Sequence, residues 1–285
     1  MKIAITGATG QLGNFVVEQL KNRVSSDSIV ALARNTEKAS ALGVEVRKFD
    51  YSKPEILTNA LQGIDRLLLI SGSELGKRTE QHINIINAAK EAGVNWIVYT
   101  SLLHLETSSL NLAGEHLATE KALKESGIDY TLLRNGWYSE NYTASIPGAI
   151  GGGAFLGSAG KGKIASAPRA DYAEAAAIVI ADEGHKGKTY ELAGDSYYTL
   201  QDLAGIISEQ CGKTIPYNNI SEEEYANILK NIGLPDGLAL GLASWDVSAS
   251  KDDLFDDSYQ LSKILGRPTT PIAESVKIAL DMASV

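Results

Sequence analysis

The chain has 285 residues, of which 44% are hydrophobic and 21% are charged, a composition that excludes a disordered or fibrous protein. The formal net charge of -9 disfavours nucleic acid and anionic membranes as partners, and the single cysteine, Cys211, permits no intrachain disulfide. No apolar stretch approaches the length of a membrane span. We therefore expect a cytoplasmic protein, with no membrane span, that acts on small molecules.

The first two-thirds of the chain alternate short aliphatic runs with segments of helical periodicity, which is typical of parallel β-α-β units. Apolar residues at 12, 15, 16 and 20 predict a helix with one buried stripe. Gly93 and Gly127 follow helical patterns, where left-handed caps are expected. The expected strands are Ile3–Thr6, Ser28–Ala33, Val44–Lys48, Arg66–Ile70, Trp96–Thr100 and Tyr130–Arg134.

A glycine-rich turn, GATGQLG at residues 7–13, lies between the first strand and its helix. A dinucleotide pyrophosphate needs a backbone without Cβ atoms in its way, together with the free N–H groups of a helix N-terminus. Gly7, Gly10 and Gly13 supply the tight turn, the close approach and the close packing of helix on strand. The turn therefore predicts a nucleotide site, because it has the required strand and helix around it.

The end of the second strand indicates which dinucleotide is bound. An acidic residue about 20 positions beyond the glycines would bind the 2′-hydroxyl of NAD, but the chain has Arg34 there and no acid. Arg34 can pair with a 2′-phosphate, and Lys38 one turn later adds positive charge. We therefore expect NADPH rather than NADH, although Arg34 is also consistent with an ordinary solvated arginine.

Two further segments follow expected strands. Asp50 suits a hydrogen bond from the adenine amino group, but it is equally suited to cap a helix beginning near Lys53. Ser71, Gly72 and Ser73 are small and let a cofactor cross the carboxyl ends of the strands.

After Arg134 the pattern changes. Seven glycines within 148–162 predict an irregular loop, either bending over a ligand or forming a mobile connection. A helix over Asp171–Ala181 and a strand over Thr189–Leu192 are expected to return to the sheet. Beyond them, Thr199 and Ser221 are expected to be helix N-caps, with a full capping box at Ser221.

These elements predict an α/β fold, a Rossmann-like doubly wound parallel sheet with a smaller, mainly helical C-terminal lobe. Residues 1–135 are expected to form the NADP-binding domain, to which 164–192 returns. Residues 136–163 and 193–285 are expected to form the substrate-binding lobe.

The sequence offers no strong catalytic acid. Short-chain carbonyl reductases place a tyrosine four residues before a lysine on one helix, but the corresponding positions here are Leu117 and Lys121. We regard Tyr259 with Lys263 as a coincidental match. The four histidines lack metal-ligand spacing, so no metal site is expected. Lys121 is a candidate for stabilising an oxyanion or holding the nicotinamide ribose, and its alternative is an ordinary solvated lysine.

The segment 134–142, RNGWYSENY, is dense in aromatic and amide side chains. Such groups can stack on a planar quinone and bond its carbonyls, and a quinone accepts hydride with little help from an acid. Trp137, Tyr138 and Asn141 are therefore candidate acceptor-binding residues. The alternative is that Trp137 and Tyr142 fill the core.

The sequence resembles the NmrA-like group of atypical short-chain dehydrogenases over almost its whole length. The Asn135–Asn141 stretch is the most specific part of this resemblance. The matching segments are Ile3–Gly13 (IAITGATGQLG), Leu67–Ser71 (LLLIS), Tyr99–His104 (YTSLLH), Tyr130–Tyr142 (YTLLRNGWYSENY), Tyr190–Asp195 (YELAGD), Phe255–Ser258 (FDDS) and Gly266–Thr270 (GRPTT).

The resemblance implies NADPH-dependent reduction of a quinone without flavin or metal, by a monomer or homodimer. Members that sense redox state without turnover, and reductases of triphenylmethane dyes, are the alternatives. Implied cofactor contacts are Gly7, Thr9, Gly10, Gln11, Leu12, Gly13, Arg34, Ser71, Gly72, Ser73, Tyr138, Ser139, Glu140 and Asn141. The acceptor would lie against Trp137, Tyr138 and Asn141, under the glycine-rich loop.

Overall fold

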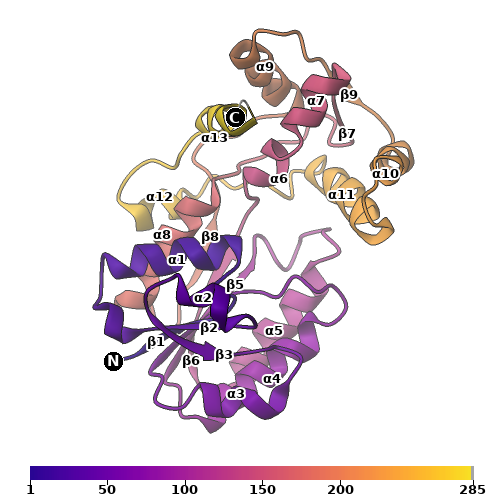
Figure 1. The fold of residues 1–285 in the computed structure, drawn as a ribbon. Coiled ribbons are helices and arrows are strands. Elements are labelled where there is room, and N and C mark those ends of the chain that lie inside the picture. The colour runs from indigo at the N-terminus through magenta and orange to yellow at the C-terminus, as the bar shows by residue number, and fades with distance from the viewer. Residues whose placement is uncertain (284–285) are drawn as a thin grey trace.

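The computed structural model describes residues 1–283, and its centre is one parallel sheet. The strands are β1 (Ile3–Ile5), β2 (Ile29–Ala33), β3 (Glu45–Lys48), β4 (Arg66–Leu69), β5 (Trp96–Leu102), β6 (Asp129–Asn135) and β8 (Thr189–Leu192). Their order is β3-β2-β1-β4-β5-β6-β8 (Figure 1), so the chain leaves β1 in one direction and resumes at β4 in the other. This reversal is the switch point at which doubly wound sheets bind ligands, and the predicted fold class is confirmed.

Helices cover both faces of the sheet (Figure 1). The pleat sends alternate side chains to opposite faces: Ile3 and Ile5 join the core under α1 and α8, whereas Ala4 joins the core under α3, α4 and α5. All three strand residues are buried, as expected for a sheet covered on both sides. The bounds are α1 (Gln11–Lys21), α3 (Pro54–Ala60), α4 (Arg78–Glu91), α5 (Ala113–Ser126) and α8 (Arg169–Ala181). A 3-10 turn, η1 (Ser26–Ser28), precedes β2, and the short α2 (Thr36–Ser40) follows it.

A second group of elements, which we call the helical lobe, has its own hydrophobic core and lies beyond the carboxyl ends of the strands (Figure 1). It comprises α6 (Glu140–Thr143), α7 (Ile146–Gly152), β7 (Phe155–Gly157), α9 (Leu200–Cys211), β9 (Tyr217–Asn219), α10 (Glu222–Asn231), α11 (Asp236–Ala249) and α13 (Ile272–Ala283). Strands β7 and β9 pair in parallel. The remaining helix, α12 (Gln260–Leu265), packs on α8 beside the sheet.

Two local expectations are wrong. The glycine-rich segment 148–162 is not irregular throughout, because α7 and β7 fall within it or overlap it. Pro147 in the first turn favours α7, buried Ile146 and Ala149 anchor it, and Gly153 ends it with a φ of +74°. The full capping box lies at Thr199 rather than Ser221, whose side chain accepts only the N–H of Glu224.

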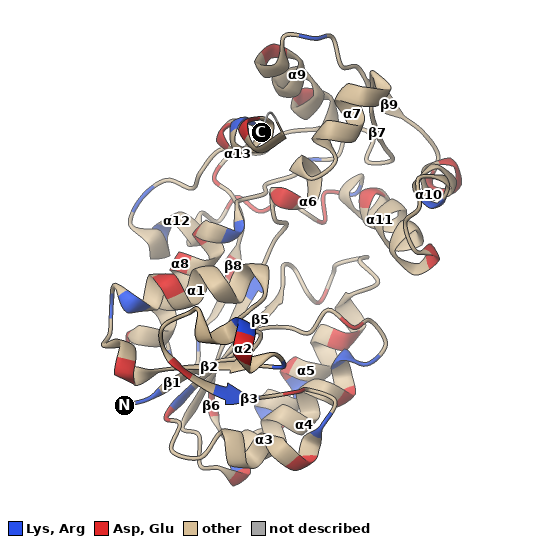
Figure 2. Ribbon diagram, in the orientation of Figure 1, with Lys and Arg blue, Asp and Glu red and all other residues tan. Residues whose placement is uncertain are grey.

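The negative charge gathers on one part of the helical lobe. Nine acidic and two basic side chains fall within 221–257, and Figure 2 shows acidic residues on α10 and α11. Within residues 1–283, none of the helices combines the length and apolar character required to cross a bilayer.

Candidate functional site

A cavity of about 630 Å³ lies at the switch point between β1 and β4. It is lined by residues that follow the carboxyl ends of β1, β2, β3 and β4. Most of the residues expected to bind the cofactor line this cavity. They are Gly7, Thr9, Gly10, Gln11, Leu12, Gly13, Arg34, Asp50, Ser71, Gly72, Ser73 and Tyr138. Residues far apart in the sequence thus share one site because parallel strands end at the same edge.

The glycine turn forms one wall, and its geometry explains its composition. Gly7 has a φ of +59°, a conformation that favours glycine. A Cβ at Gly13 would lie 2.3 Å from the carbonyl oxygen of Gly7, so α1 packs directly on the turn. Gly10 is the N-cap of α1 and offers no capping side chain. The first-turn N–H groups are therefore left for an anionic ligand.

Positive charge lines the cavity beyond β2. The Arg34 side chain is 69% exposed, and Lys38 also lines the cavity. The Nη1 atom of Arg34 donates to Oε1 of Glu74 at 3.4 Å. Asp50 is not a helix cap: its Oδ1 accepts the N–H of Ser52, whereas the N-cap of α3 is Lys53.

The peptide of Gly72 is held on both sides by α4. Its N–H donates to Nε2 of His82 at 3.0 Å, and its carbonyl accepts from Nε of Arg78 at 2.7 Å. Burial, with a smaller effect of the charge on Arg78, lowers the pKa of His82 to about 3. His82 is therefore neutral near pH 7 and able to accept at Nε2.

Tyr138, which follows β6, and Arg169, the first residue of α8, also line the cavity. The guanidinium of Arg169 lies 4.3 Å from the centre of the Tyr138 ring. Nδ2 of Asn135 donates to the Tyr138 hydroxyl at 3.3 Å, while Oδ1 of Asn135 is buried without a partner. Burial raises the pKa of Tyr138 above its ordinary value, so the phenol keeps its proton.

Four other expected site residues flank the cavity rather than line it. Asn141 accepts from Nη2 of Arg169 at 2.9 Å, and Glu140 accepts the N–H of Arg169 at 3.0 Å. The Ser139 hydroxyl is hydrogen-bonded to Ser166. The Trp137 ring packs edge-on against that of Trp245 in the helical-lobe core, at 5.6 Å between centroids.

The structure does not bring Lys121 to the cavity. Its side chain is 75% exposed and its Nζ lies 3.9 Å from Oε1 of Glu125 on the outer side of α5. Leu117 is exposed as well, because the helix turns this stripe outward and directs His116 and Glu120 inward. Lys121 therefore does not line the cavity.

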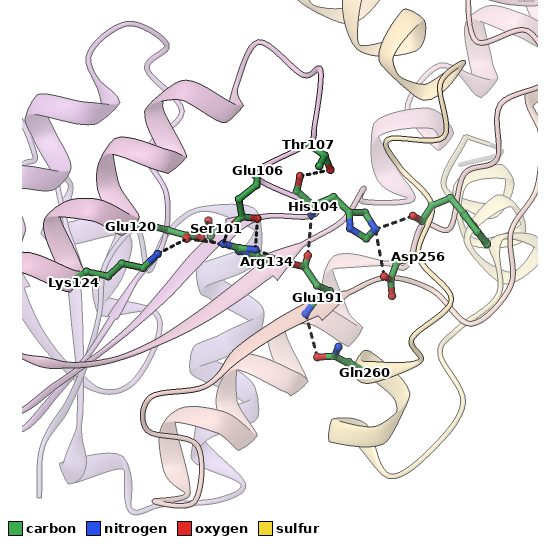
Figure 3. A network of polar contacts seen from close by, with 11 residues as sticks. Ser101, His104, Glu106, Thr107, Glu120, Lys124, Arg134, Glu191, Asp256 and Gln260 are labelled. Carbon is green, nitrogen blue, oxygen red and sulfur yellow. Dashed lines mark hydrogen bonds and ion pairs between the residues drawn. The ribbon is translucent and has the colours of Figure 1, made fainter.

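The inward face of α5 serves a buried ionic cluster centred on Arg134 (Figure 3). The guanidinium of Arg134 contacts Glu106 at 2.6 Å, Glu120 at 2.8 Å and Glu191 at 2.9 Å. The Ser101 hydroxyl donates to Glu120. Burial opposes the charge of Arg134, but its carboxylate partners raise its pKa overall. This cluster fixes the end of β6 immediately before Asn135.

Sequence reasoning missed Arg169, Glu74, Gln81 and Tyr51, all of which line the cavity. Arg169 had a usable signal: a basic residue in the first turn of a helix is disfavoured by the helix dipole, so its presence requires another reason. Tyr51, Glu74 and Gln81 have no such signal, because only the fold brings their segments together.

The chain matches the NmrA-like family over residues 1–267. It is 61% identical to quinone oxidoreductase 2 of Escherichia coli (strain K12), over 96% of this chain and 97% of that one. A crystal structure of the NADPH-dependent quinone oxidoreductase of Escherichia coli with NADPH superposes with a TM-score of 0.95 at 60% identity, over 98% of this chain and 99% of that one. The Citrobacter sp. triphenylmethane reductase with NADP(H) gives a TM-score of 0.94 at 40% identity, covering 98% of this chain and 100% of that one.

Proposed function

Because the chain belongs to the NmrA-like family, we propose that it is an NADPH-dependent quinone oxidoreductase. The observation that carries the proposal is the cavity at the switch point, with the glycine turn on one wall and Arg34 on another. The Escherichia coli relative, matched over nearly the whole of both chains, is a quinone oxidoreductase.

The cavity residues fit NADPH. The uncapped first turn of α1 at Gly10 would hold the pyrophosphate, and Arg34 with Lys38 would hold the 2′-phosphate. Asp50 would accept from adenine, and Ser71 to Ser73 would lie along the middle of the cofactor. The group supplies a hydride when bound, so this chain's residues need only orient it and handle one proton.

On the acceptor side, Tyr138 is the residue that we propose to donate that proton. A quinone that takes a hydride gains one negative charge on oxygen and needs one proton to become the hydroquinone. The Tyr138 hydroxyl accepts from Asn135, which leaves its own O–H free to donate toward the cavity. Glu140 and Asn141 hold Arg169, the Ser139 hydroxyl is hydrogen-bonded to Ser166, and Trp137 packs against Trp245 of the helical lobe.

The proposal is tested by following the loss of NADPH absorbance with 1,4-benzoquinone and 1,4-naphthoquinone, with no flavin added. We expect turnover with NADPH and slower turnover with NADH. Tight NADPH binding with no oxidation by any acceptor would favour a redox sensor instead. A triphenylmethane dye belongs in the same panel, because the Citrobacter reductase superposes over 98% of this chain.

Two variants test the proposed roles of Arg34 and Tyr138. Arg34→Glu should reverse or abolish the preference for NADPH, and an unchanged preference would remove Arg34 from the cofactor site. Tyr138→Phe should lower kcat about 100-fold or more while leaving NADPH binding intact, as expected for loss of a proton donor. Tyr259→Phe is the matched control, because Tyr259 is exposed and does not line the cavity.

We further propose that residues 1–135 with 164–192 bind the cofactor, and that residues 136–163 and 193–285 cover the acceptor. The protein would work in the cytoplasm as a monomer or homodimer. Light scattering at several concentrations measures the oligomeric state, and cell fractionation measures the location.

A further inference from the structure

Arg34 and Glu74 line the same cavity from different elements. Arg34 follows β2, whereas Glu74 follows β4, and the two side chains meet in a single contact of 3.4 Å between Nη1 and Oε1. Both are accessible, with Glu74 39% exposed. Among the side chains of residues 1–283, Glu74 is the carboxylate within ion-pair distance of Arg34.

The Glu74 carboxylate is held in place from its other side. Its Oε2 accepts from Nε2 of Gln81 at 3.3 Å and lies 3.6 Å from Nζ of Lys77. Gln81 is buried and also donates to the Ser52 hydroxyl. The carboxylate is therefore fixed with one oxygen directed at Arg34.

A 2′-phosphate and this carboxylate require the same donors. A guanidinium binds anions best through two parallel N–H groups, and the contact with Glu74 engages Nη1 of Arg34. A phosphate dianion at Arg34 would also be repelled by a fixed carboxylate on the adjacent wall. A ligand with a free 2′-hydroxyl does not need to displace Glu74 from Arg34 and carries no phosphate charge for Glu74 to repel.

We propose that Glu74 is a specificity-determining residue, which competes with the 2′-phosphate for Arg34 and so limits discrimination between NADPH and NADH. This inference rests on the proposed function, in which Arg34 binds that phosphate. Glu74 would thus allow both cofactors to be used, where Arg34 alone would favour NADPH more strongly.

The test measures binding of 2′,5′-ADP and 5′-AMP by calorimetry, without any turnover. Glu74→Gln should raise the ratio of the Kd for 5′-AMP to that for 2′,5′-ADP by about two- to fivefold, the range expected for an exposed ion pair. Glu80→Gln is the matched control, because Glu80 is exposed in the first turn of α4 and does not line the cavity. It removes the same charge and should leave the ratio unchanged.

Measuring the same substitution in the Arg34→Gln background distinguishes competition for Arg34 from the general electrostatic effect of a negative charge near the phosphate. There, Glu74→Gln should change the ratio less than it does beside Arg34, because only direct repulsion of the phosphate by the carboxylate is left; an equal change in both backgrounds would overturn the competition. An unchanged or lowered ratio in Glu74→Gln alone would overturn the inference, and a lowered one would mean that Glu74 orients Arg34. If the wild-type chain binds 2′,5′-ADP no more tightly than 5′-AMP, the proposed preference for NADPH fails first.

Discussion

The backbone N–H of Gly72 donates to Nε2 of His82, and this bond selects the tautomer of a buried histidine. Because Nε2 accepts, Nδ1 carries the proton and donates to the Thr119 hydroxyl at 3.0 Å. Thr119 in turn donates to the carbonyl of Glu115. The cavity-lining peptide at Gly72, just after β4, is thus anchored through α4 to α5.

Replacing His82 with Phe should therefore loosen this peptide. The Gly72 N–H would lose its acceptor at a partly buried site, which costs about 1 kcal/mol or somewhat more in the free energy of unfolding. NADPH binding should weaken as well. His82→Gln can place an amide oxygen near Nε2 and should recover part of both losses. Urea unfolding and NADPH titration measure the two effects, and a phenylalanine variant with wild-type values would contradict the anchoring role.

The glycine turn gives a second prediction. In Gly13→Ala, the new Cβ would meet the Gly7 carbonyl oxygen at 2.3 Å and the Ala8 Cα at 2.8 Å, and backbone cannot yield as a side chain can. We expect a loss of about 1–3 kcal/mol in stability and a large loss of NADPH affinity. Gly114→Ala is the control, because it has open space around it in α5 and should be neutral or slightly stabilising. Equal effects of the two substitutions would refute this account.

The ionic cluster around Arg134 gives a third prediction, on the stability of the fold. Arg134→Met leaves Glu120 buried with its main cation removed, and breaking a buried pair in this way costs about 3–5 kcal/mol. Adding Glu120→Gln should restore part of that stability, because the uncompensated charge is removed. Lys124→Met, 3.9 Å from Glu120 but half exposed, should change stability by less than about 1 kcal/mol. Additive effects of the Arg134 and Glu120 substitutions in urea unfolding would show that the two do not interact.

The strands and the cavity wall were predictable because their signals are local. Strands β1, β2 and β4 are short aliphatic runs, and the observed bounds of every strand of the sheet differ from the expected ones by no more than two residues, as for Trp96–Leu102. Gly93 and Gly127 take the left-handed conformation expected of them. The glycine turn and Arg34 directly follow the first and second strands. Once the strands were predicted, these two parts of the cavity wall could be predicted as well.

Sequence and structure differ where tertiary contacts outweigh local pattern. The glycine count argued against α7, yet burial of Ile146 and Ala149 in the helical-lobe core stabilises it. The expectation for Lys121 relied on spacing along one helix, whereas the orientation of that helix is set by the sheet-facing residues His116 and Glu120. Glu74 reaches Arg34 only because β1 brings β2 and β4 to either side of itself.

Asp246 is a buried acid within the helical lobe, remote in sequence from the expected site residues. Its Oδ2 accepts the N–H of Ser158 at 2.8 Å, and its Oδ1 accepts from the Tyr142 hydroxyl at 3.4 Å. Burial raises the pKa of Asp246 from 3.8 to about 6, although these two donors oppose the rise. Burial, together with the charge on Asp246, raises the pKa of Tyr217 to about 12 and also raises the pKa of Tyr225, so both neighbouring phenols keep their protons.

This raised pKa predicts a specific pH dependence of stability. The folded chain binds the Asp246 proton more tightly than the unfolded chain, so the contribution of Asp246 is complete below pH 3.8 and is lost as the pH rises through about 6. Asp246→Asn lacks this loss and should gain about 2 kcal/mol relative to wild type between pH 4 and pH 7, as measured by urea unfolding at each pH. Asp257→Asn, at an exposed carboxylate, is the control and should show no comparable trend. A constant difference between Asp246→Asn and wild type over this range would mean that Asp246 ionises in the folded chain as it does in the unfolded one.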